Sequence, residues 1–115
     1  MLVYHLSAEC YPVAKVGGLG DVVGALPKYL NEAGVTARVV VPAYNNAFFQ
    51  KTEYQTVHQG KLRLGHFVFQ YSVLYEPSNQ LGFELYQIAI PELFDRPNVY
   101  SYEDDTERFL AFQIA

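Results

Sequence analysis

Apolar residues in the first 41 positions form two short runs separated by a helical pattern. Residues 2–6 and residues 37–41, the second with three consecutive valines before Pro42, each predict a buried strand. Between them, apolar residues recur from Leu19 at the three-and-four spacing of one helix face. The members of this face are Val22, Val23, Leu26, Leu30 and Ala33. Strand, helix and strand in this order form a βαβ unit, which predicts a parallel sheet.

Two residues refine the predicted helix. Gly34 follows the last apolar position and suits the left-handed residue that ends many helices. Pro27 lies inside the pattern and lacks a backbone donor, so we expect it to bend the helix near its middle.

The second half of the chain alternates between apolar and polar residues. Residues 61–64, 67–73 and 81–90, with a turn at 77–80, predict two or three strands that are at least partly antiparallel. The fold class expected is therefore α/β: a Rossmann-like parallel sheet with an antiparallel hairpin region.

The end of the chain predicts an irregular loop over 91–104 and then a helix. The helix should begin near Asp104 and Asp105, whose carboxylates can cap free backbone donors, and its apolar side carries Phe109, Phe112 and Ile114. Neither Gly, Pro nor a basic turn follows before the last residue. We therefore expect residues 1–115 to be one incomplete domain that ends within a helix.

Composition narrows the classes of function. A net charge of −4 and a pI near 5.2 argue against a nucleic-acid platform, which would be basic. The N-terminus lacks the basic region of a signal peptide, and no apolar run reaches the roughly 18 residues that cross a bilayer, so a cytoplasmic protein without membrane contact is expected. The lone Cys10 is expected to be a buried, reduced thiol, and His5 a satisfied core histidine.

The segment Lys15-Val16-Gly17-Gly18-Leu19-Gly20-Asp21 joins the first strand to the helix. A helix start carries unpaired N–H groups and partial positive charge, and adjacent glycines let an anion approach the backbone. Lys15 adds a mobile positive charge, so the loop suits a pyrophosphate. The residues alone leave a second interpretation open, in which the glycines only permit helix–strand packing and Lys15 is solvated.

Two familiar phosphate loops do not fit this spacing. In the NTPase loop the Lys follows the glycines, whereas Lys15 precedes them. The dinucleotide fingerprint needs a third glycine where Val23 stands. A nicotinamide-dependent oxidoreductase domain is therefore the weakest alternative.

Residues 7–27, SAECYPVAKVGGLGDVVGALP, closely resemble the opening signature of glycogen and starch synthases that use ADP-glucose. The family core usually reads Lys-Thr-Gly-Gly-Leu, and Val16 stands here where Thr is common. Further similarity runs through residues 37–44, 93–97 and 102–109 and is weak over 46–85.

This resemblance implies a GT-B glycosyltransferase, with two facing Rossmann-like domains of which this chain is the N-terminal one. Such enzymes move glucose from ADP-glucose to the non-reducing end of an α-1,4-glucan with retention of configuration, and need no metal or cofactor. UDP-glucose stays open as the donor, because base selection belongs to the C-terminal domain that this chain lacks. We therefore expect the chain alone to be inactive. The alternative is a non-catalytic nucleotide- or glucan-binding module with the same fold.

The resemblance also assigns roles at the donor phosphates. Lys15 would contact the phosphates, and Gly17 and Gly18 would form the backbone cradle. Asp21 would lie near the reacting sugar as the catalytic candidate, although an Asp in a first helical turn is also stabilised by the helix dipole alone.

Two further residues are candidates for sugar or acceptor binding. Glu9 would bind sugar hydroxyls, or else be solvated. Tyr100 resembles a family tyrosine near the glucose site, with Tyr102 as the alternative equivalent.

Overall fold

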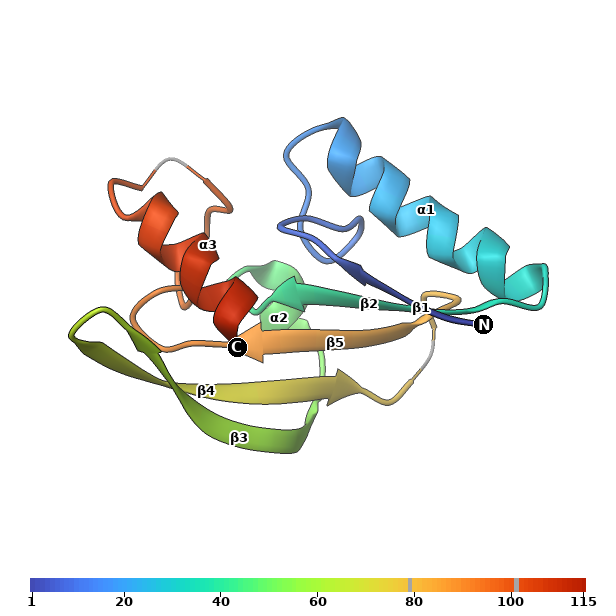
Figure 1. Cartoon of the computed structure of the whole chain (residues 1–115). Helices are drawn as coiled ribbons and strands as arrows, with labels where there is room; N and C mark the ends of the chain where they lie inside the picture. Colours follow the sequence, from blue (N-terminus) through green and yellow to red (C-terminus); the bar gives the residue numbers. More distant parts are fainter. Residues whose placement is uncertain (79, 101) are drawn as a thin grey trace.

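The computed structural model describes residues 1–78, 80–100 and 102–115. Five strands form one sheet in the order β1-β2-β5-β4-β3, visible as a continuous layer in Figure 1. Their bounds are β1 Leu2–Leu6, β2 Thr36–Pro42, β3 Gln55–Leu64, β4 Phe67–Glu76 and β5 Glu84–Ala89. Three helices accompany the sheet: α1 Gly18–Glu32, α2 Ala47–Lys51 and α3 Asp105–Ile114.

The sheet is parallel on one side and antiparallel on the other. β1, β2 and β5 are parallel neighbours, while β4 pairs antiparallel with both β5 and β3. The predicted α/β class with an antiparallel hairpin is confirmed. Of the turn predicted at 77–80, Asn79 lies outside the described residues.

α1 and α3 cover opposite faces of the sheet. Val39 and Val41 of β2 pack in a core cluster with Val23 of α1. Val40 of the same strand packs against the cluster that contains Phe112 of α3. Because successive side chains of a strand point to opposite faces, the two helices lie on different sides.

The burial predicted for β1 is wrong. Leu2 is 50% exposed and Leu6 67% exposed, because in the described part of the chain β1 pairs with β2 alone and forms the sheet edge. His5 is not a satisfied core residue either, since its Nε2 is buried with no hydrogen-bond partner among the described residues.

α1 buries a different face from the one its apolar pattern predicts. Gly20, Val23 and Pro27 are buried, whereas Val22 and Leu26 are exposed. The helix packs closely where side chains are small: a Cβ added at Gly24 would lie 2.5 Å from the carbonyl oxygen of Tyr11. Pro27 lies inside α1, which is one continuous helix in Figure 1.

The other predicted elements are found in place, with local differences. Gly34 has a φ of 91°, as predicted for the residue that ends α1. α2 and the first residues of β3 were not predicted, since residues 46–60 are mostly polar and carry no strong period. α3 begins at Asp105, but it buries Arg108, Ala111 and Phe112. Ile114 is exposed, and Asp104 makes no side-chain cap.

Replacing Gly24 by Ala should destabilise the fold, because the new Cβ would collide with the Tyr11 carbonyl and push α1 off its loop. We expect the free energy of unfolding of the full-length protein to fall by about 1–3 kcal/mol, measured by chemical denaturation. Gly18→Ala is the matched control, because a Cβ there would meet nothing within 4 Å and Ala favours helix by up to about 1 kcal/mol. Equal losses in both variants would contradict this packing.

Candidate functional site

The loop between β1 and α1 folds back on the start of the helix. Cys10 and Ala14 exchange backbone hydrogen bonds of 2.7 and 2.9 Å, and the Tyr11 N–H donates to the Gly20 carbonyl at 2.9 Å. Cys10 is fully buried, as predicted, and this burial raises the pKa of its thiol to about 12. The loop is therefore fastened to the first turn of α1.

The Glu9 carboxylate lies inside this loop and is only 3% exposed. Its Oε1 accepts hydrogen bonds from the backbone N–H groups of Val16 at 3.3 Å, Gly17 at 3.0 Å and Gly20 at 2.9 Å. Its Oε2 accepts from the Tyr100 hydroxyl at 2.8 Å. The interpretation of Glu9 as a solvated residue is wrong.

These donors keep Glu9 ionised. Burial by itself raises the pKa of the carboxyl, but the hydrogen bonds from Gly17, Tyr100, Val16 and Gly20 outweigh it and hold the pKa below its ordinary value. Burial, together with the hydrogen bond to Glu9, raises the pKa of the Tyr100 hydroxyl to about 12. At neutral pH the pair is therefore a charged acceptor and a neutral donor.

The start of α1 is open on the side that Glu9 does not use. A Cβ at Gly17 or Gly18 would meet nothing within 4 Å, and neither residue has a positive φ. Protein packing therefore does not require glycine at either position. The N–H groups of Gly18 and Leu19 have no hydrogen-bond partner in the described ranges, which leaves two backbone donors at the positive end of the helix.

Gly20 differs from the other two glycines, although the sequence suggested no role for it. A Cβ there would lie 3.0 Å from Glu9 Oε1 and 3.0 Å from Lys15 Cγ. The absence of a side chain at Gly20 thus lets the carboxylate and the lysine stem approach the same point of the helix.

Lys15 and Asp21 form an ion pair beside this opening. Lys15 Nζ lies 3.1 Å from Asp21 Oδ2, and the two side chains are 42% and 57% exposed. An ion pair this exposed contributes little free energy. The ammonium can therefore exchange its carboxylate partner for another anion without a large loss.

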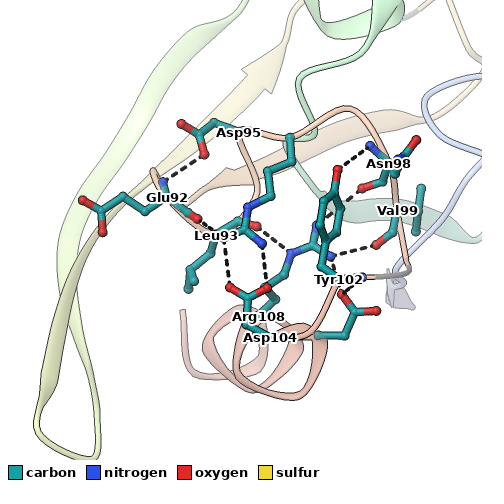
Figure 2. Close-up of polar contacts among 10 residues, drawn as sticks. Glu92, Leu93, Asp95, Asn98, Val99, Tyr102, Asp104 and Arg108 are labelled. Atoms are coloured by element: carbon teal, nitrogen blue, oxygen red, sulfur yellow. Dashed lines mark hydrogen bonds and ion pairs between the residues drawn. The ribbon is translucent and has the colours of Figure 1, made fainter.

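The loop over 91–104 is held by a buried guanidinium (Figure 2). Arg108 of α3 is fully buried; its Nε donates to the Leu93 carbonyl at 2.6 Å, and its Nη1 donates to the Val99 carbonyl at 3.1 Å and to Asp105 Oδ1 at 2.7 Å. The Tyr102 ring packs 4.6 Å from the same guanidinium. Neither periodicity nor motif indicated this role for Arg108.

A second arginine closes the same loop. Arg96 donates to both Asp104 oxygens, at 2.6 and 2.9 Å, and lies 5.0 Å from the Tyr102 ring. The Tyr102 hydroxyl accepts from the Asn98 N–H at 3.3 Å. Tyr102 thus packs against two arginines, and of the two candidate tyrosines Tyr100 is the one that reaches Glu9.

Ring contacts connect the two parts of the site. The Tyr100 ring lies 5.8 Å from Phe109, and Phe109 lies 5.6 Å from Phe94. Arg108 lies over Phe94 at 4.9 Å. The structure therefore brings together Glu9, Lys15, Gly17, Gly18, Asp21 and Tyr100 in one region and supports Tyr100 from α3.

Residues 2–115 match the family model of the starch synthase catalytic domain. The chain belongs to this family. It is 63% identical over its whole length to a glycogen synthase of Flavobacterium johnsoniae, and 36% identical to one of Thermus thermophilus. It spans 24% of the length of each of these relatives.

A solved member of the starch synthase family has the same fold. The catalytic domain of starch synthase IV from Arabidopsis thaliana, bound to ADP and acarbose, matches 98% of this chain with a TM-score of 0.84 and 27% identity. The match covers 24% of that protein.

The described ranges show neither a metal site nor a membrane-spanning helix. They contain no group of three or more His, Cys, Asp or Glu side chains placed to hold a metal ion, and no helix long and apolar enough to cross a membrane.

Replacing Arg108 by Met should loosen the 91–104 loop, because buried carbonyls would lose their donor while the volume stays similar. We expect the free energy of unfolding to fall by about 2–3 kcal/mol, measured by chemical denaturation of the full-length protein. Arg63→Met is the control, since Arg63 is exposed on β3. If the two variants unfold alike, the buried network does not hold the loop.

Proposed function

We propose that the full-length protein transfers glucose from ADP-glucose, or from UDP-glucose, to the non-reducing end of an α-1,4-glucan with retention of configuration. In this proposal the chain supplies the donor-phosphate part of the site. The observation that carries the proposal is the open start of α1, where the N–H groups of Gly18 and Leu19 have no partner among the described residues and Lys15 pairs with Asp21 of the first helical turn. The relatives are glycogen synthases, and the Arabidopsis protein holds ADP and acarbose, which supports a nucleotide-sugar donor and a glucan acceptor.

The donor's diphosphate would bind against the glycines. The open space over Gly17 and Gly18 lets phosphate oxygens approach the backbone. The Gly18 N–H would then donate a hydrogen bond to a phosphate oxygen. Gly17 contributes space and not its N–H, which Glu9 already uses. Lys15 then neutralises the charge that grows on the departing diphosphate, which is a form of transition-state stabilisation.

Asp21 is the catalytic candidate of this chain. Its carboxylate lies 3.1 Å from Lys15 Nζ, and we propose that it also lies near the reacting sugar. Tyr100, half-buried beside the same loop, is proposed to contribute to the sugar side of the site through its ring.

The rest of the site would come from a second Rossmann-like domain. Because the chain spans 24% of the relatives' length, the nucleotide base and part of the glucan would bind outside residues 1–115. The cytoplasmic location stays a prediction.

Replacing Lys15 by Ala in the full-length protein should weaken use of the donor. Loss of one charge-assisted contact to phosphate should lower kcat/KM for ADP-glucose by about 10- to 100-fold, measured in a glucan-elongation assay at saturating acceptor. Lys61→Ala is the control, because Lys61 is exposed on β3. Unchanged donor kinetics in the Lys15 variant would contradict the phosphate site.

Residues 1–115 expressed alone should show no transfer from ADP-glucose to an oligosaccharide acceptor, because the proposed donor site is incomplete without the second domain. The measurement is product formation by the isolated chain at high concentration, with the full-length protein as the positive control. Turnover by the isolated chain would show that the described residues are sufficient. A full-length protein without activity would favour the non-catalytic binding module instead.

A further inference from the structure

Glu9 acts as an anion at the phosphate loop before any ligand arrives. Three backbone N–H groups of the segment 16–20 point at its Oε1. That arrangement resembles the way a helix start holds a phosphate oxygen, but the anion here belongs to the protein. The N–H groups near the helix start are thus divided into a set that faces Glu9 and a set that stays open.

We propose that Glu9 is a positioning residue for the donor's diphosphate and not a ligand of the sugar. Its carboxylate draws the N–H groups of Val16, Gly17 and Gly20 inward, and this fixes the loop so that Gly18 and Leu19 keep their N–H groups free for the donor. The inference rests on the proposed function and deepens it by assigning Glu9 to the phosphate loop.

The geometry leaves little of the carboxylate for a sugar hydroxyl. Both oxygens are engaged, Oε1 by three donors and Oε2 by Tyr100, and the residue is 3% exposed. A ligand of sugar hydroxyls needs an accessible oxygen, whereas an internal anchor needs satisfied ones.

Glu9 and the stem of Lys15 lie against the same residue of α1. The point that a Cβ of Gly20 would occupy is 3.0 Å from Glu9 Oε1 and 3.0 Å from Lys15 Cγ. The carboxylate and the lysine stem therefore pack against the same small surface of α1. Removing the carboxylate would free the backbone donors beside the base of the Lys15 side chain.

Tyr100 connects the loop over 91–104 to the Glu9 carboxylate. Its hydroxyl holds Glu9 Oε2 at 2.8 Å, and its ring packs on Phe109 of α3. Residues near both ends of the chain therefore hold the carboxylate.

The test compares two ligands of the full-length protein, one with the sugar and one without it. For Glu9→Ala, we expect the KM for ADP-glucose and the inhibition constant of ADP to rise by a similar factor of about tenfold or more, with the KM for glucan within about twofold of the parent. Tyr100→Phe, which keeps the three backbone contacts, should change both donor constants in the same direction by a smaller factor. Glu53→Ala, at an exposed acid outside the site, is the control and should change neither constant.

Adding acetate or formate to Glu9→Ala distinguishes the positioning role from a general loss of structure. Either ion fits the space left in Glu9→Ala and can accept from the same three N–H groups, so it should restore part of the ADP affinity of this variant and leave the parent unchanged. If Glu9→Ala does not fold, the near-isosteric Glu9→Gln is measured in its place, and a rise in both donor constants supports the proposal. A rise for ADP-glucose with an unchanged ADP constant would overturn it and make Glu9 a sugar ligand.

The Lys15 variant distinguishes a failure of the proposed function from a failure of the positioning role of Glu9. If Lys15→Ala leaves ADP inhibition unchanged, the phosphate site itself is elsewhere and the proposed function of the loop fails. If Lys15→Ala weakens ADP binding and neither Glu9 variant does, only the positioning role of Glu9 fails.

Discussion

One buried carboxylate joins the three parts of this chain that meet at the start of α1. Glu9 accepts from the loop at Val16 and Gly17, from the helix at Gly20, and from Tyr100, which lies 91 residues away in the sequence. A charge out of contact with water is costly unless its hydrogen-bonding capacity is filled, and these four donors fill it. The shape of the glycine loop, and with it the opening beside Lys15, depends on this satisfied charge.

A buried charge of opposite sign organises the other side of the site. Arg108 donates mainly to backbone carbonyls of the 91–104 loop, as Glu9 accepts mainly from backbone N–H groups. Each charge therefore supplies hydrogen-bond partners to backbone groups of an irregular segment, where no regular secondary structure pairs them. Between them lie the rings of Tyr100, Phe109 and Phe94, and the Tyr44 hydroxyl ties the start of the first loop by donating to the Ala8 carbonyl at 2.6 Å.

Local patterns predicted the elements better than their burial. The βαβ unit, the hairpin and the start of α3 follow from periodicity and turn residues, which act over a few positions. Burial depends on neighbours, so Leu2 and Leu6 were misjudged because β1 lies at the sheet edge. The face of α1 was misjudged because its contact side is made of small residues, with the Gly24 backbone against Tyr11.

The sequence alone determined the α/β class, the position of the glycine loop and the resemblance to starch synthases. Each of these depends on residues that are close together in the chain. Which groups use the backbone donors of that loop was decided only by the tertiary structure. The hydrogen bond between Tyr100 and Glu9 joins residues near both ends of the chain, and the loop that carries this tyrosine is held by the buried Arg108. Hydrogen bonds between distant residues carry no periodic signal, so the occupied and the open N–H groups of one helix start look the same in the sequence.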